Sequence, residues 1–159
     1  MRAHIFLLGA IAVTGLAGCG GGSGGEHPGS GHGQAAKKAG EPAGIKVSSS
    51  EIGPIITDAS GRSLYAFTKD KAGASVCEGE CIATWPALAG KAKIALGDGV
   101  DRSLVRHSQR SEGTFQATYG DWPLYYYAGD ARPGDLDGQG VDGEWFVVGA
   151  DGKLIKRDA

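Results

Sequence analysis

The chain contains one seven-residue motif twice, displaced by 60 positions. The pattern is Leu-Tyr-x-aromatic-x-x-Asp, and it occupies residues 64–70 and again residues 124–130. The same displacement brings further pairs into register: Trp85 with Trp145, Leu88 with Val148, Lys93 with Lys153, and Ile94 with Leu154. A fixed period of this kind is the signature of a duplicated supersecondary unit. We therefore expect two repeats, residues 45–104 and 105–159, within one globular domain.

The N-terminus has the pattern of an export signal. Arg2 precedes an apolar run over residues 5–16, and small residues lead to Cys19. Such a run is too short to span a membrane and is typical of a cleaved signal peptide, here residues 1–18. The Leu-Ala-Gly-Cys ending resembles a bacterial lipobox, which implies acylation of Cys19; the alternative is an ordinary signal peptide with a chance cysteine. Acylation would make membrane lipid a partner and place the protein at the periplasmic or outer face of the cell envelope.

Residues 19–44 are predicted to form a flexible tether. Residues 20–44 hold ten glycines and no large apolar side chain, so they cannot bury enough surface to offset their ordering entropy. The whole chain carries a formal net charge of −2, which argues against nucleic acid as a partner.

The remainder predicts an all-β domain. Short runs rich in β-branched and aromatic residues alternate with Gly, Asp and Pro turns, as in antiparallel hairpins. The expected strands cover residues 45–47, 55–57, 64–68, 114–119, 124–127, 145–148 and 153–156. We expect residues 55–57 and 64–68 to pair around the Asp58–Gly61 turn, with Leu and Ala on one face and Tyr and Phe on the other. A short helix or structured loop is expected over residues 77–88, ending at Pro86.

Aromatic residues recur at equivalent places in the two repeats. They are Tyr65, Phe67, Trp85, Tyr125, Tyr127 and Trp145. One interpretation makes them core residues and cross-strand pairs related by a pseudo-twofold axis; the other makes them a platform on which a carbohydrate or another small ligand stacks. Asp70 and Asp130 end their strands, where a carboxylate commonly accepts backbone N–H bonds from the following turn.

Cys77 and Cys81 are the only cysteines besides Cys19. In an exported domain two such cysteines usually form a disulfide, and a loop this short would gain about 2 kcal/mol by the chain-entropy model. The alternative is a redox or copper site, because Cys-x-x-x-Cys thiolates can hold copper and His107 could be a third ligand. Glu78 and Glu80 count against that alternative, since they would raise thiol pKa values.

A second metal pattern lies in the long loop of repeat 2. Asp135, Asp137 and Gln139 stand at positions 1, 3 and 5 of a calcium-type loop, with glycine at position 6. Position 12 is Phe146, so the closing bidentate carboxylate is missing, and a plain Asp/Gly turn is the competing interpretation.

No pattern of an enzyme is present. The sequence has no Gly-x-Ser-x-Gly, no His-Glu-x-x-His and no phosphate-binding loop. We therefore expect a protein without catalytic residues and without a resident cofactor, copper and calcium being the metals that the cysteine and aspartate patterns leave open.

Three segments together resemble one family. They are the two Tyr-x-aromatic-x-x-Asp motifs, the Cys-x-Gly-x-Cys-x-x-x-Trp-Pro element of residues 77–86, and the Gly-Asp-x-x-Gly-Gln-Gly stretch of residues 134–140 that precedes Trp145. This combination resembles the secreted-repeat bacterial lipoproteins, over residues 45–154. The resemblance implies export and a repeated β domain, and it supplies no catalytic residues.

The sequence thus favours an exported, lipid-anchored binding or structural module that contacts an envelope protein or a small ligand. The alternative is a periplasmic copper or electron-transfer accessory protein that uses Cys77 and Cys81.

Overall fold

The computed structural model describes residues 44–90 and 93–159. The signal peptide, Cys19 and the tether up to residue 43 lie outside the described residues. The described residues form the following elements, in chain order: β1 (Gly44–Ser50), β2 (Gly53–Asp58), β3 (Tyr65–Phe67), α1 (Glu80–Thr84), β4 (Ala89–Gly90), β5 (Ala95–Leu96), the 3-10 helix η1 (Arg102–Leu104), β6 (Val105–Gln109), β7 (Phe115–Tyr119), β8 (Trp122–Pro123), the 3-10 helix η2 (Val141–Gly143) and β9 (Trp145–Val147). Within this part of the chain no helix is long and apolar enough to cross a membrane.

Each repeat begins with a β-hairpin. In the first, β1 pairs antiparallel with β2, and Ile45 lies opposite Asp58. In the second, β6 pairs with β7, and Val105 lies opposite Tyr119. The hairpins are therefore equivalent, and the second is one residue longer between these paired positions.

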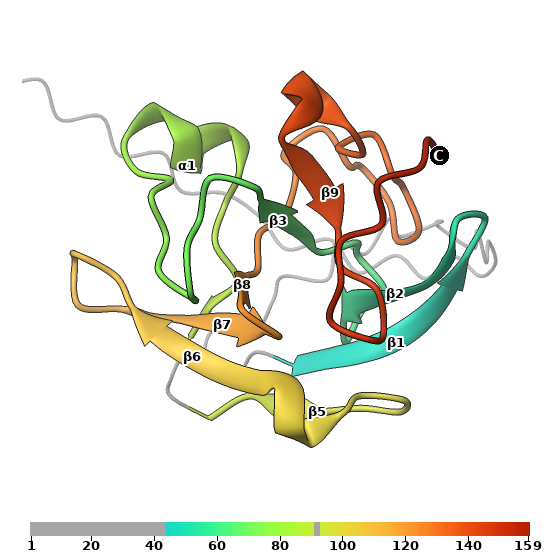
Figure 1. The fold of residues 1–159 in the computed structure, drawn as a ribbon, viewed down its shortest axis with the longest axis horizontal. Coiled ribbons are helices and arrows are strands. Elements are labelled where there is room, and N and C mark those ends of the chain that lie inside the picture. The colour runs from blue at the N-terminus through green and yellow to red at the C-terminus, as the bar shows by residue number, and fades with distance from the viewer. Residues whose placement is uncertain (1–43, 91–92) are drawn as a thin grey trace, which may run out of the picture. The chain divides into compact units, whose positions relative to one another are not determined.

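The motif strands pair within their own repeats only at their first residue, where Leu64 N–H donates to Ile56 O at 3.2 Å and Leu124 N–H donates to Ala117 O at 3.0 Å. In the first repeat the turn at residues 58–61 returns the chain beside β2, with Thr57 bridged to Ser63. From Tyr65 onward, β3 pairs antiparallel with β9 of the other repeat, with Tyr65 opposite Val147 (Figure 1). The second motif strand does the same in reverse: Tyr125 forms a bridge with Ala87, and the Tyr126 N–H donates to the Pro86 carbonyl at 2.8 Å. Each repeat thus pairs its tyrosine strand with the tryptophan segment of the other.

A pseudo-twofold axis passes between the two motif strands. Tyr65 and Tyr125 exchange both backbone hydrogen bonds, with N···O distances of 2.8 and 2.9 Å. Further bonds join the small sheets on each side of this axis: Ile56 N–H donates to Val148 O, and Ala117 N–H donates to Leu88 O. The result is one continuous run of strands that contains both repeats, in the order β1, β2, β9, β3, the 124–126 segment, β4, β7 and β6.

Both faces of the motif strands are buried. Leu64 and Ala66 face one apolar cluster, whereas Tyr65 and Phe67 face the other, as the alternation in the sequence predicts. The first cluster is aliphatic and includes Ile45, Ile56, Leu88, Leu124 and Val148. The second is aromatic and includes Trp85, Tyr125, Trp145 and the Cys77 side chain.

These features confirm the all-β, two-repeat fold. Two details add to it. The expected short helix near the cysteines is the five-residue α1, and β5 pairs with β1 in parallel, whereas the other strand pairs between the described elements are antiparallel.

Candidate functional site

The polar groups of the repeated motif bond to each other across the two repeats. The Tyr65 hydroxyl donates to Asp130 Oδ2 at 2.9 Å, and the Tyr125 hydroxyl donates to Asp70 Oδ2 at 2.7 Å. All four residues are buried, none more than 5% exposed. The tyrosine hydroxyl of each motif therefore donates a hydrogen bond to the aspartate of the other motif.

The second oxygen of each carboxylate holds the turn that follows the motif. Asp70 Oδ1 accepts the Val76 N–H at 2.8 Å, and Asp130 Oδ1 accepts the Asp137 N–H at 3.1 Å. The Tyr125 hydroxyl also lies 2.7 Å from Ser75 Oγ. Each aspartate thus ties its own loop to the opposite repeat.

Burial governs the acidity of these groups. Desolvation raises the pKa of both Asp70 and Asp130, although hydrogen bonds from tyrosine and backbone donors oppose the rise. The pKa values of Tyr65 and Tyr125 are also raised, first by burial and also by the adjacent carboxylates. The tyrosines consequently remain protonated donors at physiological pH.

The repeated aromatic residues form a stack on the same face of the sheet. Trp85 and Trp145 lie parallel at the centre, with ring centroids 3.8 Å apart. Phe67 stacks on the outer face of Trp145 at 4.3 Å, and Tyr127 packs on Trp85 at 4.6 Å. Trp85 and Trp145 are only 4% and 3% exposed, so their faces are occupied by protein and are not open to a stacking ligand.

A glycine permits the close packing at one end of this stack. A Cβ atom on Gly138 would lie 2.9 Å from both the Tyr65 ring and Tyr127 Cβ. The Gly138 N–H also donates to the Tyr65 hydroxyl at 3.3 Å.

A third tyrosine–aspartate pair, which the motif did not predict, lies on the aliphatic face. The Tyr126 hydroxyl donates to Asp58 Oδ2 at 3.1 Å, and the Arg62 guanidinium lies over the Tyr126 ring at 4.6 Å. The signal in the sequence was weak, because the residue that corresponds to Tyr126 in repeat 1 is Ala66.

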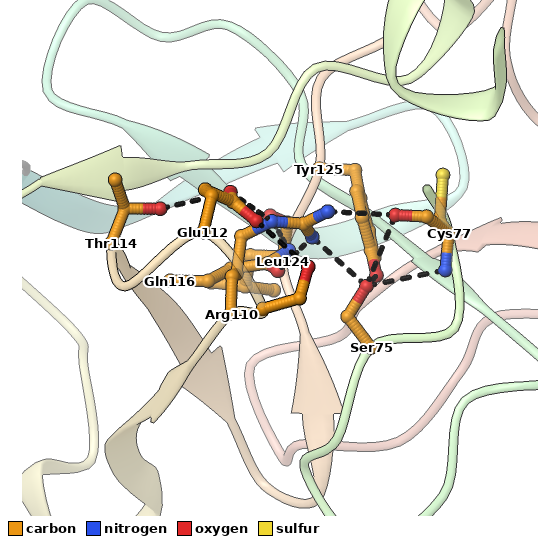
Figure 2. Close-up of polar contacts among 9 residues, drawn as sticks. Ser75, Cys77, Arg110, Glu112, Thr114, Gln116, Leu124 and Tyr125 are labelled. Atoms are coloured by element: carbon orange, nitrogen blue, oxygen red, sulfur yellow. Dashed lines mark hydrogen bonds and ion pairs between the residues drawn. The ribbon is translucent and has the colours of Figure 1, made fainter. Parts of the chain in front are cut away.

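The two cysteines are bridged, as expected. Cys77 and Cys81 form a disulfide that spans the start of α1, and the Cys77 side chain belongs to the aromatic cluster. Arg110, from the end of the β6–β7 hairpin, holds this loop in place, because its Nη2 donates to the Cys77 carbonyl at 2.8 Å (Figure 2).

Arg110 was not recognised from the sequence, although it lies at the centre of a buried polar network. Its Nη1 donates to Ser75 Oγ and to Gln116 Oε1, both at 2.9 Å. Its Nε donates to Glu112 at 2.7 Å. Figure 2 shows these side chains converging from the hairpin and the loop that precedes the disulfide.

The residues of the two metal hypotheses have other contacts in the structure. Asp135 Oδ2 accepts the N–H groups of Ala131 and Arg132, and Gln139 binds Val147 N–H and Ile155 O through its amide. Asp137 is exposed. His107 packs edge-on against Phe115 at 5.1 Å on β6. Within the described residues no group of three or more His, Cys, Asp and Glu side chains is placed to hold a metal ion.

Two shallow depressions lie on the surface of the described residues. One, of about 300 Å³, is lined by the end of the β1–β2 hairpin and by Gly134 and Leu136. The other, of about 310 Å³, lies beside α1 and is lined by Glu78, Ile82 and the residues around Arg110. Neither contains the paired tyrosines or the tryptophans.

One comparison with known proteins gives a match. A family model described as a secreted repeat of unknown function, Lipoprotein_15, matches residues 46–89 and residues 107–149. No curated protein and no solved structure gives a significant match to the chain. The two matched segments correspond to the two structural repeats, and together they cover more than half of the sequence. The chain therefore belongs to the Lipoprotein_15 family of secreted repeats.

Proposed function

We propose that this exported protein is a lipid-anchored, non-enzymatic binding module of the cell envelope. One observation carries the proposal: the hydroxyl and carboxylate groups of the repeated motif are buried and bonded to each other at 2.7–2.9 Å. Groups engaged in this way hold two repeats together. Binding then belongs to the exposed loops and strand edges that this scaffold presents.

Contact with a partner protein is favoured over a stacking platform. The two tryptophans are covered on both faces, by each other and by Phe67 and Tyr127. Phe67 and Tyr127 are themselves half-buried. A flat sugar ring would therefore have to displace core contacts in order to stack.

Anchoring is proposed at Cys19, because the Leu-Ala-Gly-Cys pattern precedes a glycine-rich tether that separates the domain from the lipid. Metabolic labelling with an alkyne fatty acid tests this step. We expect label on the parent protein and none on a Cys19→Ser variant, which should also leave the membrane fraction. Equal labelling of parent and variant would overturn the anchor.

Binding can be tested with a photo-cross-linking residue in the membrane-anchored protein in intact cells. Val76 beside the disulfide, His107 on β6 and Lys153 in the last turn are exposed sites in three separate segments. A binding module should give a discrete adduct from at least one of these sites and none from buried Val148. Failure at all three exposed sites would contradict the proposal.

The copper or redox interpretation makes a different prediction for the cysteines. The protein is exported without reductant, examined by native mass spectrometry, then mildly reduced and offered copper and calcium. The binding module should keep its disulfide and take up neither metal. One tightly bound copper that is lost in Cys77→Ser and in His107→Ala would overturn this assignment.

A further inference from the structure

The two halves of the domain differ at their outer edges. In the first half, the outer edge of β1 is covered by the segment that begins at β5. Gly44 and Ile45 pair in parallel with Ala95 and Leu96. Beyond that pair, the Gly97 N–H donates to Ile45 O at 2.8 Å, and the Val47 N–H donates to Asp98 O at 3.0 Å. An additional extended segment thus completes this side of the sheet.

The equivalent edge of β6 has no such cover among the described residues. The repeat displacement places Val105 at the position of Ile45 and His107 at that of Val47. Arg110 N–H donates to Thr114 O, so by strand alternation the backbone groups of Val105, His107 and Gln109 point away from β7. Within the described part of the chain, no residue pairs with the His107 N–H on that side.

The segment that could have covered β6 runs elsewhere. By the same displacement it would be residues 155–158. Instead, the Ile155 N–H donates to Val147 O at 3.0 Å, beside β9. The Gln139 amide then binds the carbonyls of Ile155 and Arg157, at 2.6 and 2.8 Å. These bonds hold the segment at β9, so none of the described residues covers the edge of β6.

One acceptor of this edge is bonded to a basic side chain. Arg106 Nη1 donates to the Val105 carbonyl at 2.9 Å, the acceptor that corresponds to Ile45 O in the first half. Arg106 and His107 on β6, and Arg102 in η1 just before it, are all exposed. Charged residues commonly protect an edge strand from unwanted pairing, and the same charges attract an acidic strand.

We propose that the outer edge of β6 binds an extended acidic segment of an envelope protein, added in parallel as β5 and the following residues are added to β1. The proposal rests on the binding function given above and names its partner's chemistry. The segment must offer an N–H to Val105 O and a carbonyl to the His107 N–H, which is strand addition to an open sheet edge.

The covered edge also predicts the side chains of that segment. A glycine is needed at the donor position, because a Cβ on Gly97 would lie 2.8 Å from Lys46 Cβ. An apolar residue should precede it, since Leu96 packs on the aliphatic cluster. An acidic residue should follow it, at the position of Asp98, because Arg106 and His107 are exposed on β6. The expected pattern is apolar-Gly-acidic.

The probe is a synthetic peptide with the sequence of residues 94–100, whose one charged side chain is that of Asp98, added to the mature, acylated protein in detergent micelles. Binding is measured by fluorescence anisotropy and by amide hydrogen exchange at His107. We expect slower exchange at His107, and no binding of a control peptide that carries valine at its Gly97 position. Arg106→Ala frees the Val105 carbonyl but also removes one attracting charge, so this variant should still bind the peptide and should not bind the valine control.

A matched pair of variants tests the backbone donor itself. His107→Pro removes the N–H but should be tolerated at an outward-facing edge position, whereas His107→Ala keeps it. We expect His107→Ala to bind and His107→Pro not to bind, with equal thermal unfolding. No binding even by Arg106→Ala, or equal binding of the valine control, would overturn the proposal. A dimer that only His107→Pro abolishes would show that a second copy occupies the edge and would overturn the partner named here.

The cross-linking experiment separates this proposal from the general function. An adduct from Val76 together with none from His107 would leave the binding module in place and overturn only the role of the β6 edge.

Discussion

Three aspartates accept a tyrosine hydroxyl, and their surroundings set their acidity in opposite directions. Burial raises the pKa of Asp70 and Asp130, each of which accepts hydrogen bonds from a tyrosine and from one backbone N–H. Burial acts in the same direction on Asp58, but four hydrogen bonds from Ser60, Arg62 and Tyr126 outweigh it and lower the pKa. The number of donors decides the sign.

Asp70→Asn tests the raised pKa of Asp70. Because the folded-state pKa lies above the ordinary value of 3.8, the folded protein binds the proton more tightly, and this stability is lost as pH rises above 3.8 through the folded pKa. The variant lacks that loss, so its unfolding free energy relative to the parent should increase with pH over this window. Denaturant titrations at several pH values measure it; a difference that falls with pH would contradict the assignment.

At the residue scale the sequence predicted the backbone partners of Asp70 and Asp130 but not their tyrosine partners. The motif ends at a turn, and Asp70 and Asp130 do accept backbone N–H groups there. The tyrosine partner could not be predicted, because it lies 55 residues away from Asp70 and 65 residues away from Asp130 and depends on how the repeats pack.

At the scale of elements, the disulfide loop depends on a residue from the other repeat. Arg110 is 8% exposed and bonds to Ser75, Cys77 and Gln116. The bridge closes only a short loop, so much of the order of this loop depends on the Arg110 contacts.

Arg110→Met should therefore destabilise the protein by about 2–4 kcal/mol, because buried acceptors on Cys77 and Gln116 lose their donor. Hydrogen exchange around the disulfide loop should become faster than in the rest of the domain. Denaturant unfolding and exchange mass spectrometry measure these effects, with exposed Lys153→Met as the control. A loss no greater than that of the control would show that the network is dispensable.

Alternation in the sequence predicted which side chains share a face of each motif strand, but not which strand lies beside it. Residues 64–68 were expected to pair with residues 55–57 around a tight turn. The turn and the pairing of Leu64 with Ile56 are present, but from Tyr65 onward the strand leaves β2. Hydrophobic alternation identifies two faces and leaves the edge partner open. The partner of β3 is β9, 80 residues further along the chain.

At the scale of the whole molecule, the exchange of strands makes the two repeats a single unit. Residues 44–104 alone would leave β3 without β9 and the 84–88 segment without residues 124–128. Each isolated repeat would also expose half of the aromatic stack.

We therefore expect separate fragments 44–104 and 105–159 to be unfolded and to recover β structure only when mixed in equal amounts. Circular dichroism and one-dimensional NMR measure this, with the intact 44–159 segment as the control. Cooperative thermal unfolding of either fragment alone would contradict the exchange.

The duplicated motif predicted a pseudo-symmetric all-β domain, and the family match and the fold confirm it. It did not predict where the symmetry ends. The different paths of residues 95–98 and 155–158 depend on tertiary bonds such as those of Gln139, which local sequence patterns do not encode.

The pairing across repeats is tested most directly by two double-mutant cycles on unfolding free energy. Tyr65→Phe combined with Asp130→Ala should show a coupling of about 1.5–3 kcal/mol, the range for a hydrogen bond to a charged group. Tyr65→Phe combined with Asp70→Ala, the aspartate of its own motif, should be additive to within about 0.5 kcal/mol. If Tyr65 coupled to Asp70 and its effect were additive with that of Asp130, the tyrosine–aspartate bond would lie within one repeat, which would contradict the pairing across repeats.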